Sequence, residues 1–403
     1  MSQPPFADDA PQAMNAAGSS PTNLPTNRAS GTEASAFNGS SGGSGDGRET
    51  YAADELAIVL SHYDLGMIES IQEFPRGSRK APKLILRTTK GIYLLKRRAR
   101  GKDDPLKVAF DHALQKHLAK RKFPLPRLID TRKKNNSVLR LNEGTYELFE
   151  YIKGANHDWS SEATQDAGKI LAQFHKLLKD YSPGHDSGAR VSIRFLPSGS
   201  YHQSRSVGKS LRNIPEVLMK RYTSGSDDRA NKVNQLVQNL QAAYDEAAGR
   251  ANELGLNESP EQIVHSDWHP GNMLFLGTRV VAVVDYDAAR YERRITDAAN
   301  GALQFSILGR GYDPATWPEQ IDESRYKGFL QSYNLEADKG LSSGELRCIP
   351  WLMIEALIAE SVIPIAKEGS FARMEAVGFL HMVWRKARWL RDHADHLAHM
   401  IEG

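Results

Sequence analysis

The chain has 403 residues, of which 25% are charged, with a formal net charge of +3 and one cysteine, Cys348. A lone cysteine excludes a disulfide scaffold and a cysteine-based zinc cluster, and it suits a reducing compartment such as the cytoplasm. We expect neither a membrane nor a nucleic acid as a partner, because no stretch reaches the roughly 20 apolar residues of a membrane span and the excess positive charge is modest.

The first 50 residues differ from the rest in composition and charge. They hold five acidic and two basic side chains, a charge of −3, so the other residues carry +6. This segment is rich in Ser, Gly, Pro and Ala, and its only aromatic residues are Phe6 and Phe37. Such a segment cannot bury enough apolar surface to offset the entropy cost of ordering. We therefore predict a disordered tail over residues 1–50, without the basic and apolar regions of a secretory signal.

The next hundred residues predict a small sheet with one main helix. Helical spacing of apolar residues predicts a first helix over 51–65 and a second over 105–121, which Pro124 and Pro126 end. Strand-like patterns occur at residues 67–74, 83–88, 91–96, 137–141 and 145–152. The first alternates apolar and polar residues, which predicts a half-buried strand.

From about residue 160 the pattern is mainly helical. Helices are predicted at 167–178 and 233–248, with several more between 343 and 399, and one strand pair at 273–276 and 280–286 interrupts them. The stretch 183–231, rich in Gly, Ser and Arg, is predicted to be an irregular excursion. The expected fold is therefore α+β and bilobal, with a small antiparallel-sheet lobe over 51–152 and a larger, mainly helical lobe over 153–403.

A cluster of polar residues accompanies the predicted strand pair. Asp267 and Asn272 precede it, and Asp285 follows its apolar second strand. Because a hairpin brings its two ends together, these side chains can converge. Carboxylate and amide oxygens are ligands that Mg²⁺ prefers, and a carboxylate left off the metal can accept a proton from a hydroxyl. The alternation of His265, Asp267 and His269 also suits zinc, but no third His and no Cys lies nearby, which favours magnesium.

The string HSDWHPGN at 265–272, followed by a hairpin and Asp285, resembles the catalytic loop and metal-binding Asp of the aminoglycoside phosphotransferase family. That family includes choline, homoserine and methylthioribose kinases and has a protein-kinase-like fold. The resemblance implies that Asp267 is the catalytic base, that Asn272 and Asp285 hold Mg²⁺, and that His265 supports the loop. The family's usual string is close to HGDLHPGN, so Ser266 replaces a glycine.

Other parts of the family pattern follow in the same order. Lys96 ends the strand GIYLLK and matches the lysine that neutralises the α- and β-phosphates of ATP. Asp111, on the next helix, is its implied partner, where the family more often has Glu. The segment FEYIKG resembles the adenine-binding hinge, with the backbone carbonyl of Glu150 and the backbone amide of Ile152 facing adenine. The phosphate-covering loop is reduced to residues 75–82, with the single glycine Gly77.

We therefore predict an ATP- and Mg²⁺-dependent phosphotransferase acting on a hydroxyl of a small molecule. The alternative is an inactive kinase-like nucleotide-binding or scaffold protein, which the sparse phosphate loop and Asp111 favour. The sequence names neither the acceptor nor the oligomeric state. An acidic pocket would suit an aminoglycoside or another amine as acceptor. Candidate residues for such a pocket are Glu319, Asp322, Glu323, Glu355 and Glu360. Homoserine or another sugar-like or amino-acid alcohol is an equally open acceptor.

Overall fold

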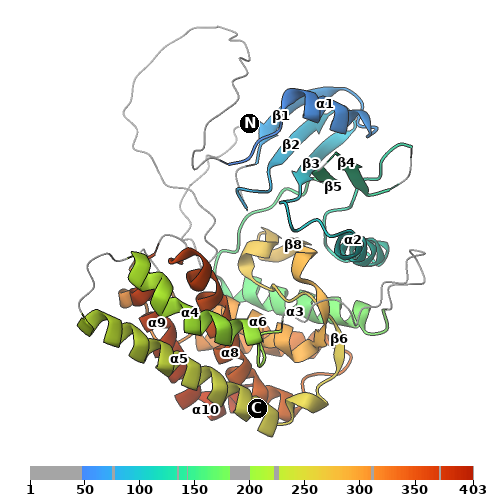
Figure 1. Ribbon diagram of the computed structural model, residues 1–403. Helices are drawn as coiled ribbons and strands as arrows, with labels where there is room; N and C mark the ends of the chain where they lie inside the picture. Colours follow the sequence, from blue (N-terminus) through green and yellow to red (C-terminus); the bar gives the residue numbers. More distant parts are fainter. Residues whose placement is uncertain are drawn as a thin grey trace, which may run out of the picture. The chain divides into compact units, whose positions relative to one another are not determined.

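The protein is described by a computed structural model (Figure 1). It describes residues 48–74, 78–133, 136–142, 144–181, 200–221, 227–309, 313–371 and 374–402. Nearly all of the predicted tail and Gly77 of the phosphate-covering loop lie outside these residues. The described residues form two compact units, a smaller one of residues 48–103 and 130–148 and a larger one of 104–129 and 149–402. The larger unit thus includes the helix over 105–120.

The smaller unit is an antiparallel sheet of five strands in the order β1-β2-β3-β5-β4, which confirms the predicted sheet. Its elements are α1 (Ala53–Ser61), β1 (Ile68–Glu73), β2 (Lys83–Thr88), β3 (Gly91–Arg97), β4 (Val138–Leu141) and β5 (Gly144–Glu150). Leu84 and Leu86 of β2 are buried, and Leu84 pairs directly with buried Leu95 of β3. This two-residue period places the core on one face of the sheet.

Strand β1 lies where it was expected, but the prediction that it is half-buried is wrong. Ile68 and Ile71 are 40% and 42% exposed. The strand is at the edge of the sheet, where it pairs with β2 on one side. Edge strands are less covered than central ones, so an alternating pattern there need not mark a buried face.

The larger unit is mainly helical, as predicted. Its helices are α2 (Pro105–Lys120), α3 (Ser161–Leu178), α4 (Arg205–Arg221), α5 (Asp227–Glu253), α6 (Arg294–Ser306), α7 (Glu323–Glu336), α8 (Ser343–Glu368), α9 (Ala376–Asp392) and α10 (Ala394–Glu402). Two short antiparallel pairs accompany them, β6 (Glu261–Val264) with β9 (Arg290–Arg293) and β7 (Met273–Leu276) with β8 (Arg279–Val283). The β7–β8 hairpin matches the predicted strand pair, whereas β6 and β9 were not predicted.

Helix α8 is the centre of this unit. It packs against α4, α5, α6, α9 and α10, and nearly all of its residues from Leu346 to Ile365 are buried. A helix that is apolar on all sides belongs in a core. Among the described residues it is the one helix long and apolar enough to cross a membrane, and 83% of that apolar stretch is buried inside the protein.

Helix α4 corrects the expectation that 183–231 is irregular, within the part of this stretch that the structure describes; residues 183–199 and 222–226 lie outside the described residues. Val207, Leu211, Ile214 and Leu218 recur at helical spacing, and all four are buried. They pack α4 against α5 and α8. The Gly- and Ser-rich surroundings and Pro215 within the helix concealed this pattern, because both disfavour helices on average.

Helices α3 and α7 approach closely at Gly168. A Cβ atom at this position would lie 2.2 Å from the backbone carbonyl oxygen of Phe329 on α7. Real Cβ atoms do not approach backbone oxygens so closely, so any side chain here must push the two helices apart.

We expect Gly168→Ala to lower the free energy of unfolding by about 1–3 kcal/mol because of overpacking, although alanine has the higher helix propensity. Gly249→Ala on α5 is the matched control, since a Cβ there meets no atom within 4 Å. The control should raise the free energy of unfolding by up to about 1 kcal/mol. Urea unfolding measures both. Equal stability of the two variants would contradict the close approach of α3 and α7.

Candidate active site

The loop 265–272 is held at both ends by short strands. It begins directly after β6, whose last residue, Val264, pairs with Arg290 of β9. It ends at the β7–β8 hairpin, where the amide of Val284 donates a hydrogen bond to the carbonyl oxygen of Asn272 at 2.9 Å. Asp285 follows Val284, so the hairpin brings Asp285 next to the end of the loop, as the sequence predicted.

Asp267 lies in this loop with its side chain 38% exposed. The side-chain amide of Asn272 donates to Asp267 Oδ2 at 2.8 Å and to its backbone oxygen at 3.0 Å, and His269 Nε2 lies 3.3 Å from Oδ1. Burial acts to raise the pKa of Asp267, but His269 and Asn272 outweigh it and hold the pKa below its usual value. Asp267 is therefore an oriented, ionised carboxylate that a ligand can reach.

Asn272 and Asp285 are suited to hold a magnesium ion. The amide nitrogen of Asn272 is bound to Asp267, which leaves its Oδ1 oxygen as a ligand. Asp285 is exposed and has φ of 65°, a left-handed conformation that non-glycine residues rarely adopt. Among the described residues, no group of three or more His, Cys, Asp or Glu could hold a metal. Two oxygen ligands instead fit Mg²⁺ that binds together with phosphate oxygens and water.

The orientation of the loop depends on a buried carboxylate, Asp297 of α6. Its two oxygens accept hydrogen bonds from the backbone amides of His265 (2.6 Å) and Ser266 (2.7 Å). His175 Nε2 lies 3.2 Å from the same carboxylate, and His175 Nδ1 lies 2.8 Å from the hydroxyl of Tyr333. Burial acts to raise the pKa of Asp297, but its hydrogen bond and charge interaction with His175 hold the pKa below its usual value. Asp297 thus has a structural role in orienting the loop, and His175, which contacts it, was not predicted.

His265 contacts the loop through its ring. The ring is fully buried and meets Trp268 edge-on at 5.4 Å between centroids, with Tyr286 at 5.1 Å. Burial lowers the pKa of His265. Both nitrogens of His269 are engaged, Nδ1 by the amide of Gly271 and Nε2 by Asp267. The contacts of His269 thus occupy both nitrogens that the zinc ion considered from the sequence would need, and the ring of His265 is buried away from solvent.

In the smaller unit, Lys96 of β3 lies beside a buried acid that was not predicted. Glu147 of β5 is fully buried, with Oε2 3.7 Å from Lys96 Nζ and Oε1 2.7 Å from Arg98 Nε. Asp111, the implied partner of Lys96, is on α2 in the larger unit, 3.0 Å from Lys107 Nζ. The pairing of Lys96 with Asp111 stays a prediction.

The predicted adenine-binding segment is extended and attached at both ends. Phe149 forms a bridge with Leu128, and the amide of Glu150 donates to the carbonyl of Arg127 at 2.8 Å. At the other end, Ala155 exchanges two backbone hydrogen bonds with Phe275 of β7. The contacts of Glu150 and Ile152 with adenine stay a prediction.

The five candidate acids for an acceptor pocket do not converge. Asp322 caps α7 and pairs with Arg325, while Glu323 of the same helix lies 3.3 Å from His396. Glu355 pairs with His202 at 2.9 Å. Glu319 belongs to the segment whose Pro318 and Gln320 carbonyls accept from Lys386 of α9. Glu360, on α8, interacts electrostatically with Asp267.

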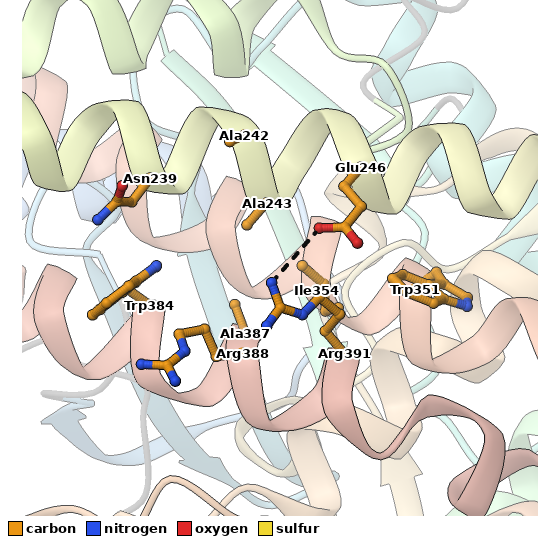
Figure 2. A pocket seen from close by; sticks show the side chains of 10 residues that line it. All are labelled: Asn239, Ala242, Ala243, Glu246, Trp351, Ile354, Trp384, Ala387, Arg388 and Arg391. Carbon is orange, nitrogen blue, oxygen red and sulfur yellow. Dashed lines mark ion pairs between the residues drawn. The ribbon is translucent and has the colours of Figure 1, made fainter.

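A separate hollow of about 240 Å³ lies between α5, α8 and α9 (Figure 2). Two tryptophans line this hollow, and an arginine lies over each indole ring. Arg250 is 5.6 Å from the ring centroid of Trp351, and Arg388 is 5.0 Å from that of Trp384. Arg391 pairs with Glu246 at 3.9 Å. None of the predicted site residues lines this hollow.

The family model described as "Phosphotransferase enzyme family" matches residues 70–343. The chain is similar to the homoserine kinase of Granulibacter bethesdensis, with 24% identity over 66% of this chain and 78% of the relative. It has the same identity to the homoserine kinase of Bradyrhizobium sp. over 76% of this chain and 82% of that one.

Solved structures share the fold at low sequence identity. An aminoglycoside phosphotransferase from Alicyclobacillus acidocaldarius matches with a TM-score of 0.60 and 15% identity, over 89% of this chain and 99% of that chain. Amicoumacin kinase hAmiN, in complex with AMP-PNP, Ca²⁺ and Ami, matches with a TM-score of 0.58 and 13% identity, over 86% and 94%.

Ser266 is a strained position in the loop. Its φ is 65°, and its buried hydroxyl has no hydrogen-bond partner among the described residues. A left-handed conformation costs an L-residue roughly 1–2 kcal/mol, whereas glycine adopts it freely.

We expect Ser266→Gly to raise the free energy of unfolding by about 1 kcal/mol, measured by urea unfolding. Ser266→Ala is the control, because it removes the hydroxyl but keeps the Cβ atom that makes this conformation costly. A glycine variant no more stable than the alanine variant would show that the backbone here is unstrained.

We expect Asp297→Asn to lower the free energy of unfolding at pH 7 by about 1–3 kcal/mol, because an amide offers one oxygen to two backbone donors. The low pKa of Asp297 stabilises the fold above about pH 4, and this contribution is lost as pH falls through the folded-state value. The difference between variant and wild type should therefore shrink in acid. Urea unfolding between pH 7 and 3 tests this, with the exposed Asp245→Asn on α5 as control. A constant difference would contradict the assignment.

Proposed function

Because the chain belongs to the phosphotransferase enzyme family, we propose that it transfers the γ-phosphoryl group of ATP to a hydroxyl group of a small-molecule acceptor. The observation that carries this proposal is the state of Asp267. Its carboxylate is ionised, reachable and oriented by the Asn272 amide. A base must meet these requirements to receive a proton from an alcohol.

In the proposed step, the acceptor oxygen forms a bond to the γ-phosphorus as the bond from phosphorus to the β–γ bridging oxygen breaks. The hydroxyl proton passes to Asp267, and ADP leaves. Most of the catalysis in such transfers comes from positioning and charge stabilisation rather than from covalent chemistry. Two sets of hydrogen bonds supply this positioning: those that Asp297 accepts fix the loop backbone, and the one that Asn272 donates fixes the carboxylate of Asp267.

The nucleotide contacts are proposed for the residues that the family pattern implies. Asn272 and Asp285 would hold Mg²⁺, which when bound neutralises charge on the phosphates. Lys96 would neutralise the α- and β-phosphates, with Asp111 as its implied partner and Glu147 beside it in the smaller unit. The backbone at Glu150 and Ile152 would bind adenine. Cys348 is buried and forms no disulfide, which suits the cytoplasm as the proposed location.

We expect Asp267→Asn to reduce kcat by about 10²–10⁴-fold, because the amide cannot accept the proton. The assay is ADP release with an acceptor found by screening alcohols. The melting temperature and its rise with Mg²⁺-ATP should be retained in this variant, whereas Asp285→Asn should lose the Mg²⁺-dependent part of that rise. Full activity of Asp267→Asn would disprove its role. Mg²⁺-dependent ATP binding by wild type without turnover of any alcohol would favour an inactive kinase-like protein.

A further inference from the structure

The segment 201–204 directly precedes α4 and is attached to α5 and α8, the two helices against which α4 packs (Figure 1). The hydroxyl of Tyr244 on α5 accepts a hydrogen bond from the amide of Ser204 at 2.8 Å and donates one to the carbonyl oxygen of Tyr201. Gln203 has φ of 47°, in the left-handed region that residues with a side chain rarely adopt. Contacts with the helices, rather than its own backbone preference, therefore hold the segment in place.

His202 attaches the segment to both helices at once. Its Nδ1 lies 2.9 Å from Oε2 of Glu355 on α8, and its Nε2 lies 3.2 Å from Oδ1 of Asn252 on α5. Both partner atoms are oxygens that accept hydrogen bonds, so the ring makes both bonds only when each nitrogen carries a proton. The other carboxylate oxygen of Glu355 accepts from the amide of Gln203 at 3.2 Å. The geometry therefore requires a cationic His202.

The charges around His202 come from three elements. Glu355 of α8 is fully buried, and His202 supplies the counter-charge that a buried carboxylate needs. On α5, Asn252 is neutral, and burial raises the pKa of Tyr244, which keeps this hydroxyl neutral as well. Burial and Arg293 of β9 act to lower the pKa of His202, but Glu355 and Asn252 outweigh them and raise it above its usual value. Burial also raises the pKa of Glu355, so acid weakens the same pair.

Tyr201 connects the segment with the proposed active site. Its hydroxyl donates to Glu360 at 3.2 Å. Burial raises the pKa of Tyr201, and the charges of Glu360 and Asp267 raise it further. The residue next to His202 thus lies within electrostatic reach of the proposed base.

We propose that His202 is a positioning residue, which in its protonated form holds the segment 201–204 on α5 and α8 and so keeps Tyr201 beside Asp267. The catalytic part of this inference rests on the proposed function. A neutral ring keeps one of the two hydrogen bonds and leaves the charge of Glu355 without its counter-charge. Because the pKa of His202 is raised by folding, its stabilising contribution is present below about pH 6.5 and is lost as pH rises through the folded-state value.

Hydrogen exchange in the full chain tests the attachment without any substrate. The quantity measured is the protection of the backbone amides in a peptide that covers residues 201–204, corrected for the intrinsic rise of exchange with pH. We expect this protection to fall at least about tenfold between about pH 6 and pH 9, with its midpoint at the pKa of His202. NMR of labelled histidine rings gives that pKa independently. Constant protection across this range would overturn the inference.

Two variants should move this midpoint in opposite directions. Glu355→Gln removes the negative charge beside Nδ1 of His202 and should move the midpoint to lower pH by about one pH unit or more. Asn252→Asp adds a negative charge beside Nε2 and should move it to higher pH by a similar amount, which keeps the test decisive if Glu355→Gln does not fold. A side chain that only fills space would give no such shifts. The control is His396→Asn, since exposed His396 also pairs with an acid, Glu323.

ADP release with Mg²⁺-ATP and an accepted alcohol tests the link to the reaction. We expect kcat/KM for the alcohol to fall with the same alkaline midpoint and to follow the shift in Asn252→Asp. KM for ATP should stay constant, because the segment is attached to α5 and α8 and not to the residues proposed for the nucleotide. Glu360 also titrates, with a pKa of about 7, but Asn252 is bonded to His202, so the shift assigns the fall to His202. His202→Asn should lower kcat/KM about tenfold at pH 7 and abolish this pH dependence.

The outcomes distinguish this inference from the proposed function. If protection changes with pH but kcat/KM does not follow it, the proposed function stands and the inference is wrong. The same conclusion holds if the midpoint of Asn252→Asp equals that of wild type. If wild type neither binds Mg²⁺-ATP nor releases ADP with any alcohol, the proposed function fails, and the catalytic part of the inference fails with it.

Discussion

The site depends above all on Asp297, whose carboxylate accepts hydrogen bonds from two consecutive backbone amides of the loop. The loop that carries Asp267 has little regular structure, and Ser266 within it is strained. Such a loop needs an external partner for its amide groups, because buried donors without acceptors are costly. Helix α6 provides that partner, Asp297, which is hydrogen-bonded to His175 of α3, and His175 is in turn hydrogen-bonded to Tyr333 of α7. The position of the proposed base therefore follows from the packing of three helices.

The acids of the larger unit differ in the side chains that pair with them. Where an acid serves the fold, a basic side chain lies against it, as with Glu345 and Arg294. Asp267 is also held by a basic side chain, His269, together with the amide of Asn272, whereas Glu360 accepts hydrogen bonds from a hydroxyl and an amide. Asp267 is kept ionised, while Glu360 is pushed toward its protonated form. Environments that separate the pKa values of neighbouring carboxylates are typical of functional sites.

Much of the fold could be predicted from the sequence, because local patterns determine its elements. The strand at 83–88 and the helix at 105–121 match β2 and α2 closely, since both have strong periodicity and clear ends. Helix α4 was missed because average composition outweighed a real helical spacing, and β6 and β9 because strands of four residues carry too little pattern. Asp267, Asn272 and Asp285 could be predicted as site residues because they lie in one motif. The contacts of Glu147 and His175 could not be predicted, because they join residues far apart in the chain.

Helix α8 is the central helix of the larger unit, and it also carries Glu360, which interacts electrostatically with Asp267. A side chain on a surface loop can be exchanged at little cost to the fold. A side chain on a central helix cannot, because its replacement must also satisfy the packing around it. A substitution at Glu360 should therefore disturb α6, through Gln304, as well as the surroundings of Asp267.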